Sequence, residues 1–182
     1  MYGLNAHHDH RFSSIYHWIG IVIICSASIP LHFVYEWTGE NVIAGLFTPI
    51  NESIWEHLNL VYWPLLLWWG LGYLLFKNKY RLSLANWVTS AMLSILISMV
   101  FITSWYYVWT EAFLVESSII DVGSLFIAVP LAQLVAIHVY KSLTPRLIYL
   151  WLSSLILIFL AGLFLYFTFN APDLPFFIPP SG

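Results

Sequence analysis

Residues 147–169 read LIYLWLSSLILIFLAGLFLYFTF and contain no charged side chain. An α-helix rises about 1.5 Å per residue, so this run is long enough to cross the roughly 30 Å hydrocarbon core of a membrane. A helix pairs its backbone hydrogen bonds within one segment, whereas an open strand would leave them unpaired in lipid. The stretch therefore predicts a transmembrane helix.

Four further apolar runs precede this one, at about residues 14–35, 54–76, 84–109 and 120–140. The composition agrees with a membrane protein, because 60% of the 182 residues are hydrophobic and only 8% are charged. Soluble domains carry about 25% charged residues. The sequence predicts an all-α membrane protein, a five-transmembrane-helix bundle that forms a single integral membrane domain over residues 1–182.

The charged residues predict how the bundle is oriented. All six basic residues fall on one side of the predicted spans: Arg11, Lys77, Lys79, Arg81, Lys141 and Arg146. Eight of the nine acidic residues fall on the other side or at its mouth, and only Asp9 does not. By the positive-inside rule the basic side is cytoplasmic. We expect a multi-pass protein of the cell membrane, of the bacterial inner-membrane type, with its N-terminus inside and its C-terminus outside.

The link between the first two spans, residues 38–50, is too short and too broken to cross a membrane. It contains Gly39, Gly45 and Pro49 around an apolar patch at residues 42–47. This pattern is typical of a re-entrant or interfacial segment after the first helix. Folding of such a segment against the outer mouth would bring Glu36 close to Glu52 and Glu56.

A cluster of polar residues flanks this link, within HFVYEWTGENVIAGLFTPINESIWEH, residues 32–57. No Lys or Arg occurs between residues 12 and 76, so the carboxylates have no local cation. Ionisable residues at membrane depth are a functional-site hypothesis by default. We assign catalysis to the carboxylates of Glu36, Glu52 and Glu56. We assign metal ligation to the imidazoles of His32 and His57, and a supporting role to the amide of Asn51.

Two features of the second helix qualify these assignments. Ser53 and Glu56 fit the capping box S-x-x-E, which starts a helix. For Glu56, helix capping and a chemical role are therefore equal alternatives. If the helix already runs through Glu52, then Glu52 and Glu56 share a face. His57 points about 100° away from Glu56 and need not join the same site.

Other polar residues lie further along the chain. Asp121 opens the fourth span from the outer side, where an acid suits a helix N-terminus, and it is a further candidate metal ligand. Thr103 and Tyr107 share a helix face near the outer end of the third span and are candidate hydrogen-bond donors. The run HHDH at residues 7–10 can bind metal adventitiously.

Two stripes of small residues predict helix packing, because small side chains let backbones approach closely. One is on the third span and the other on the fourth: Ser90, Ser94 and Ser98; and Ala128, Ala132 and Ala136. Gln133 lies in the middle of the fourth span and is expected to make an interhelical hydrogen bond.

Imidazole and carboxylate ligands together are typical of a zinc site, or of a site for another first-row divalent metal. A metal with three such ligands and a water would support hydrolysis or acyl transfer on a lipid or lipid-linked substrate, with a spare Glu as general base. The single cysteine, Cys25, excludes an internal disulfide and a cysteine-based zinc site. The expected partners are membrane lipids, and no motif for nucleic acid is present.

The sequence leaves the function class open. The same acidic and imidazole groups suit a small transporter or an ion- or solute-binding membrane subunit, in which a polar path would continue inward past Gln133 to His138. A structural partner in a larger membrane complex, or in a homo-oligomer, is the third alternative.

The cluster also carries a resemblance. A helix ending in an HFxYEW-like run, followed by GLFxPxNESxWEH, resembles a family of small bacterial polytopic membrane proteins with no assigned function. The close match covers about a fifth of the chain, and an acid at the position of Asp121 also agrees. The resemblance implies that the cluster and Asp121 act as a set, and it supplies no reaction.

Overall fold

The computed structural model describes the backbone of residues 2–115 and 117–179 and the side chains of residues 15–115, 117 and 119–179. Within these ranges the chain is helical and contains no strand. The long helices are α1 (Tyr2–Trp37), α4 (Asn59–Tyr80), α5 (Leu84–Tyr107), α6 (Ser118–Ser142) and α7 (Leu147–Phe167). The short elements are α2 (Val42–Gly45), α3 (Ile54–His57), a π-helical turn at Val108–Ala112 and a 3₁₀ turn at Pro175–Phe177.

Five helical segments of the described chain are long and apolar enough to cross a membrane, by length and composition. They are Ile15–Trp37, Ile54–Tyr80, Leu84–Ala112, Ile119–Ser142 and Leu147–Phe167. The predicted five-helix fold is confirmed, and most boundaries agree within a few residues. α1 begins at Tyr2, well before the apolar run, and the second span is divided at Leu58 into α3 and α4.

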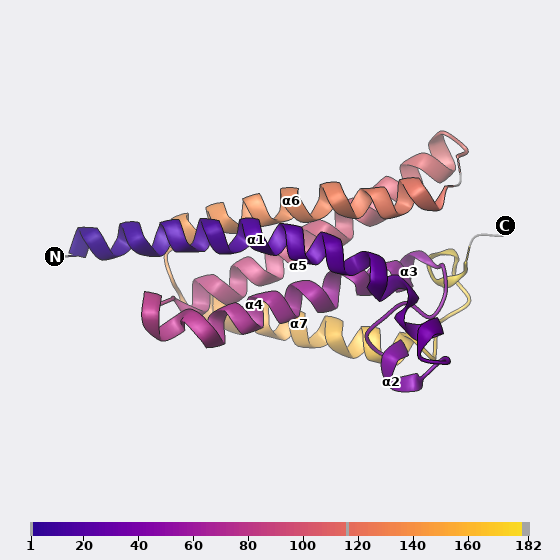
Figure 1. Ribbon diagram of the computed structural model, residues 1–182, viewed down its shortest axis with the longest axis horizontal. Helices are drawn as coiled ribbons and strands as arrows, with labels where there is room; N and C mark the ends of the chain where they lie inside the picture. The colour runs from indigo at the N-terminus through magenta and orange to yellow at the C-terminus, as the bar shows by residue number, and fades with distance from the viewer. Residues whose placement is uncertain (1, 116, 180–182) are drawn as a thin grey trace.

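The helices lie side by side along one long axis (Figure 1). α5 contacts α4, α6 and α7, and α1 packs against α4 and α6. The turns from α4 to α5 and from α6 to α7 lie at the end of the bundle where α1 begins, whereas α2, α3 and the segment that follows α7 lie at the other end. Five of the six basic residues lie in or beside those two turns, at one end of the bundle: Lys77, Lys79, Arg81, Lys141 and Arg146.

The predicted small-residue stripes lie in the interior of the bundle. All six side chains are fully buried: Ser90, Ser94, Ser98, Ala128, Ala132 and Ala136. α5 and α6 run antiparallel, and hydrogen bonds tie them near both ends, from Asn86 Nδ2 to the carbonyl oxygen of Tyr140 (3.3 Å) and from Trp105 Nε1 to that of Ile120 (3.2 Å). That register sets the serine stripe against the alanine stripe. Both stripes therefore serve helix packing inside the bundle.

Gly72 marks a second close approach, between α1 and α4. Tyr16 stacks on Trp68 and donates its hydroxyl to the carbonyl oxygen of Trp68 at 2.7 Å. A Cβ placed on Gly72 would lie 2.6 Å from the Tyr16 ring. Only glycine leaves room for the tyrosine at this point, and the contact fixes α1 against α4.

The link from α1 to α3 turns sharply at Gly39 and Glu40, which both have positive φ angles, of 69° and 60°. Asn41 then caps α2 by accepting a hydrogen bond from the Ile43 amide at 2.9 Å. Gly45 of α2 lies against Tyr35 and Ile50, with no space for a side chain. The link thus folds back onto the end of α1.

The C-terminal segment packs on the same end of the bundle. Trp55 of α3 stacks on Phe164 of α7, with ring centroids 4.6 Å apart, and also contacts Phe177 at 5.0 Å. α3 is therefore packed between α7 and the C-terminal turn, which holds in place the residues that follow Trp55.

Candidate functional site

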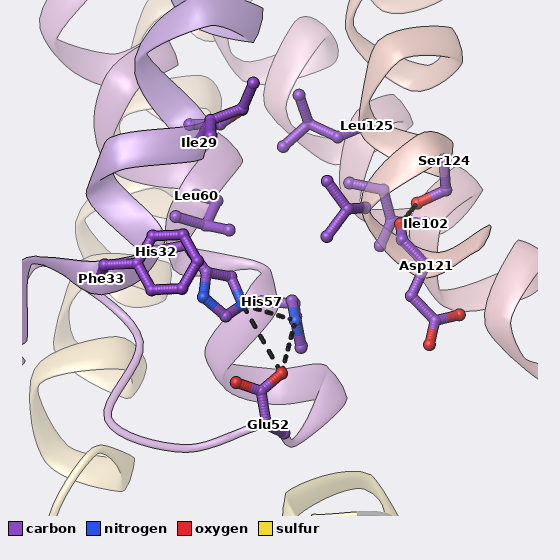
Figure 2. Close-up of a pocket in the computed structure, with 12 residues that line it drawn as sticks. Ile29, His32, Phe33, Glu52, His57, Leu60, Ile102, Asp121, Ser124 and Leu125 are labelled. Carbon is purple, nitrogen blue, oxygen red and sulfur yellow. Dashed lines mark hydrogen bonds and ion pairs between the residues drawn. The ribbon is translucent and has the colours of Figure 1, made fainter. Parts of the chain in front are cut away.

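Three side chains from separate parts of the chain converge at the end of the bundle that contains α2 and α3 (Figure 2). The Nε2 atoms of His32 on α1 and His57 on α3 lie 3.2 Å apart. Glu52, from the loop before α3, places Oε2 3.5 Å from each of these nitrogens. We call these three residues the His–Glu–His triad.

The ring of His57 is oriented by the backbone. Its Nδ1 lies 2.9 Å from the carbonyl oxygen of Ser53. A carbonyl oxygen only accepts hydrogen bonds, so Nδ1 carries the proton, and in the neutral ring Nε2 presents a lone pair to the triad. Metal-binding histidines are held in this way by a hydrogen bond from the other ring nitrogen.

The turn that carries Glu52 is held by its two neighbours. Asn51 Oδ1 accepts a hydrogen bond from the Ser53 amide at 2.8 Å, and Ser53 Oγ caps α3 by accepting from the Glu56 amide at 3.3 Å. Ser53 is extended (ψ 155°), so the helix begins after Glu52 and not before it. Glu52 is thereby free to turn toward α1, and it does not share a helix face with Glu56.

The spacing of the triad suits a tetrahedral divalent metal. Ligand atoms bound to zinc at 2.0–2.1 Å in tetrahedral geometry lie about 3.4 Å apart. The three observed separations are 3.2, 3.5 and 3.5 Å. A point just outside the plane of the three atoms lies about 2.1 Å from each of them, which is within the range of zinc–ligand bond lengths. The residues present therefore fit three of the four positions of such a metal.

A cavity of about 360 Å³ opens beside the triad, and all three residues line it. Asp121 projects from α6 on the opposite wall, so this predicted site residue shares the cavity without belonging to the group of three (Figure 2). The rest of the lining is mostly apolar. The imidazoles are largely covered, with side-chain exposures of 15% for His32 and 12% for His57, whereas Glu52 is 55% exposed.

Glu56 belongs to a different network. Its carboxylate is buried, and Oε2 accepts hydrogen bonds from the Ile50 amide at 3.2 Å and from Asn59 Nδ2 at 3.1 Å. Asn59 Oδ1 in turn accepts from Trp63 Nε1 at 3.0 Å. The carboxylate therefore ties the end of the link to the start of α4, and it is not part of the triad.

The remaining predicted residues lie apart from the triad. Glu36 is exposed one turn beyond His32 on α1, and Thr103 and Tyr107 are half-buried on α5 without lining the cavity. His138 is exposed on α6, and Gln133 is buried in the bundle with no hydrogen-bond partner among the described residues. The side chains of the HHDH run at residues 7–10 lie outside those described.

The sequence reasoning did not identify the walls of the cavity. On α1 and α6 these walls are Ser28, Ile29 and Phe33 around His32, and Val122, Ser124 and Leu125 beyond Asp121; Leu60 of α4 and Ile102 of α5 complete them. Each set on α1 and α6 recurs at helical spacing of three to four residues around a predicted site residue, and that spacing is the signal that could have found them.

The fold and the site together define a class: a helical protein whose described part contains five helices long and apolar enough to cross a membrane, and which has a histidine–carboxylate group beside a largely apolar cavity at one end of the bundle. The chain belongs to the family of unknown function DUF6512, whose model matches residues 7–180. This agrees with the expectation of a family without an assigned function. Comparison with curated proteins finds no match, and neither does comparison with solved structures.

Proposed function

We propose that the protein is a metal-dependent membrane hydrolase, with His32, Glu52 and His57 as ligands of one divalent metal such as zinc. The observation that carries this proposal is the triad geometry, because its three separations match the edges of a zinc tetrahedron. Three protein ligands beside a cavity leave a fourth position for water, which is the arrangement of catalytic rather than structural zinc sites.

The reaction that suits this site is hydrolysis of an ester or amide bond in a lipid or lipid-linked substrate. Zinc held by these three residues would supply a water of lowered pKa and would polarise a carbonyl group. In the proposed hydrolysis a water oxygen would bond to the carbonyl carbon, the bond from that carbon to the leaving group would break, and a proton from the water would pass to the leaving group. Asp121, on the opposite wall of the cavity, is the carboxylate we assign to that proton transfer.

We also infer how the chain sits in the cell membrane. The basic turns at one end of the bundle support a cytoplasmic position for that end, which leaves the triad on the outer side. The link containing α2 is best placed at the membrane interface, because Val42 and Ile43 expose apolar surface next to the polar residues Glu40 and Asn41.

Zinc stoichiometry tests the metal site. The measurements use protein in which His7, His8 and His10 are replaced by Asn, so that the HHDH run cannot contribute adventitious metal. We expect about one tightly bound zinc per chain by elemental analysis after dialysis. Loss of a residue that only hydrogen-bonds to a metal ligand typically weakens metal binding by about 10–100-fold. His57→Ala removes a ligand itself, so it should weaken zinc binding by more than this. Glu36→Gln, an exposed carboxylate one turn from His32, is the matched control and should retain zinc.

Catalysis is tested with a 4-nitrophenyl ester of a medium-chain fatty acid in detergent micelles. Chelation should abolish hydrolysis, and added zinc should restore it. Asp121→Asn should retain zinc but lower kcat by about 10²–10⁴-fold, the usual contribution of a side chain that transfers a proton in the reaction. If the protein in which residues 7, 8 and 10 are replaced holds no zinc, or holds it equally well after His57→Ala, the proposed site is wrong.

Transport is a second candidate function, favoured by buried polar groups inside the bundle. Both amide atoms of Gln133 and both ring nitrogens of His17 are buried without a hydrogen-bond partner among the described residues, as are the hydroxyls of Ser90, Ser94 and Ser98 on α5. His138 is exposed on the outside of α6, so it does not continue a path from Gln133 through the interior of the bundle. The buried His17, which packs against Trp69 and Trp87, would take that place. Proton or cation flux into vesicles that Gln133→Leu abolishes, with zinc unaffected, would favour transport over hydrolysis.

A further inference from the structure

The cavity beside the triad has one polar end and apolar walls. The triad and Asp121 supply the polar end, and the remaining walls come from four helices: Ile29 and Phe33 of α1, Leu60 of α4, Ile102 of α5, and Val122 and Leu125 of α6 (Figure 2). This division resembles the division within a lipid, which has a polar linkage at one end and a hydrocarbon chain beyond it.

The two serines in the wall add little polarity. Ser28 Oγ donates to the carbonyl oxygen of Cys25 at 2.8 Å, and Ser124 Oγ donates to that of Asp121 at 2.5 Å. Both side chains are buried, and each hydroxyl hydrogen is used within its own helix. The part of the cavity away from the triad therefore offers van der Waals contact and no free donor, which suits a hydrocarbon and not a sugar or a peptide.

One wall of the cavity is also an outer surface of the bundle. Ile29 is 51% exposed and Phe33 is 42% exposed, although both line the cavity. They lie within the apolar segment Ile15–Trp37, which packs between α4 and α6. Surface exposed on such a segment faces lipid chains and not water. These exposures support a lateral opening of the cavity between α1 and α6.

We propose that this cavity binds the acyl chain of a membrane lipid, which enters laterally between α1 and α6 and places its ester or amide group at the triad. The proposal deepens the proposed function: hydrolysis of the bound lipid rests on that function, whereas binding of the acyl chain does not. At about 360 Å³ the cavity is at the small end of the range for ligand pockets, so it accommodates one chain and not a whole phospholipid. The second chain and the headgroup remain in the surrounding membrane and water.

The test is photolabelling in phosphatidylcholine vesicles that contain a small fraction of phospholipid with a diazirine in its acyl chain. Mass spectrometry of the irradiated protein should find labelled residues concentrated at Ile29, Phe33 and Leu125, above the level on lipid-facing residues of α7 such as Leu155 and Ile158, which are exposed outside the cavity. Labelling spread evenly over all exposed apolar residues would overturn the proposal.

A pair of tryptophan variants sharpens the test. Ile29→Trp fills the lateral opening with the volume of several methylene groups, so labelling of Leu125 should fall about tenfold. Val22→Trp lies two turns earlier on the same face of α1, is 65% exposed and does not line the cavity, so it should leave labelling unchanged. Both positions are on the surface, so neither substitution overpacks the core. Equal labelling of Leu125 in the two variants would overturn the lateral route.

Two further outcomes separate this proposal from its alternatives. Zinc content measured on the same samples reports on the metal site alone, so labelled protein without zinc would sustain the lipid site and refute the proposed hydrolase. A second copy of the chain seated between α1 and α6 would exclude lipid, and labelling of Leu125 would then fall as the protein-to-lipid ratio rises. That dependence would overturn the lipid proposal.

Discussion

Glu56 offers the clearest separation of a structural role from a chemical one. Its Oε2 accepts two hydrogen bonds, from the Ile50 amide and from the fully buried Asn59 side chain. Glu56→Ala would leave both donors without an acceptor. A buried donor left unsatisfied costs about 1–3 kcal/mol, and the Ile50 amide, which is only half-buried, regains part of this from water. We expect a loss of about 2–4 kcal/mol in the free energy of unfolding.

Glu56→Gln is the matched variant. An amide oxygen in the position of Oε2 keeps an acceptor for both donors, so the loss should stay below about 1 kcal/mol. Glu36→Ala, at an exposed carboxylate on α1, should change stability by no more than about 0.5 kcal/mol. At about 2–4 °C per kcal/mol for a chain of this size, Glu56→Ala should lower Tm by about 5–15 °C, and the other two variants by a few degrees at most.

The chain supplies its own reporter for this measurement. Cys25 is the only cysteine and is buried in α1, so a thiol-reactive fluorogenic dye in detergent reports unfolding on heating. Equal Tm values for Glu56→Ala and the wild type would refute the structural role of the carboxylate. If Glu56→Gln keeps its Tm and its zinc but loses ester hydrolysis, Glu56 acts in the chemistry, and its hydrogen bonds are not its whole function.

Two further predictions use the same thermal assay on the helix contacts. Gly72→Ala should cost about 1–3 kcal/mol because its Cβ would meet Tyr16, whereas Gly70→Ala in the same helix meets nothing within 4 Å and should be neutral or stabilise by up to about 1 kcal/mol. Equal effects would show that α1 does not lie against α4 as described. Ser94→Ala removes a buried hydroxyl without a described partner and should be neutral or slightly stabilising, whereas Ser94→Leu should cost about 1–3 kcal/mol by forcing α5 and α6 apart. A tolerated leucine would refute the close packing of the two stripes.

The fold could be predicted from the sequence because lipid imposes one simple rule on it. Each spanning segment must be apolar and must pair its own backbone, so a hydropathy pattern alone locates five helices. What the pattern could not locate are the departures from a regular helix. The break at Leu58 and the π-helical turn at Val108–Ala112 change the backbone hydrogen bonding but not the hydropathy of the segment, so a hydropathy pattern detects neither of them.

The candidate site was predictable as a region but not as a set of contacts. Helical spacing separated His57 from Glu56 by about 100°, and the structure places them in different networks. The pairing of Glu52 with Glu56 was conditional on a helix that began earlier. Ser53 caps α3, which begins at Ile54, two residues after Glu52, and Glu52 turns instead toward His32. Side-chain caps in the loop decide this, and an apolarity pattern does not report them.

The exposures within the triad indicate why such a site would lie at this depth. Glu52 is half in water, whereas the two imidazoles are covered and one is fixed by the Ser53 carbonyl oxygen. A cation and a water molecule can therefore arrive past Glu52, and a hydrocarbon chain can arrive from the apolar side past Ile29. The linkage between the headgroup and chain of a lipid lies at the boundary between those two environments. If the proposed hydrolase function is right, a ligand set fixed at that boundary, between the exposed Glu52 carboxylate and the apolar cavity, would bring water and the scissile bond together while the lipid stays in the membrane.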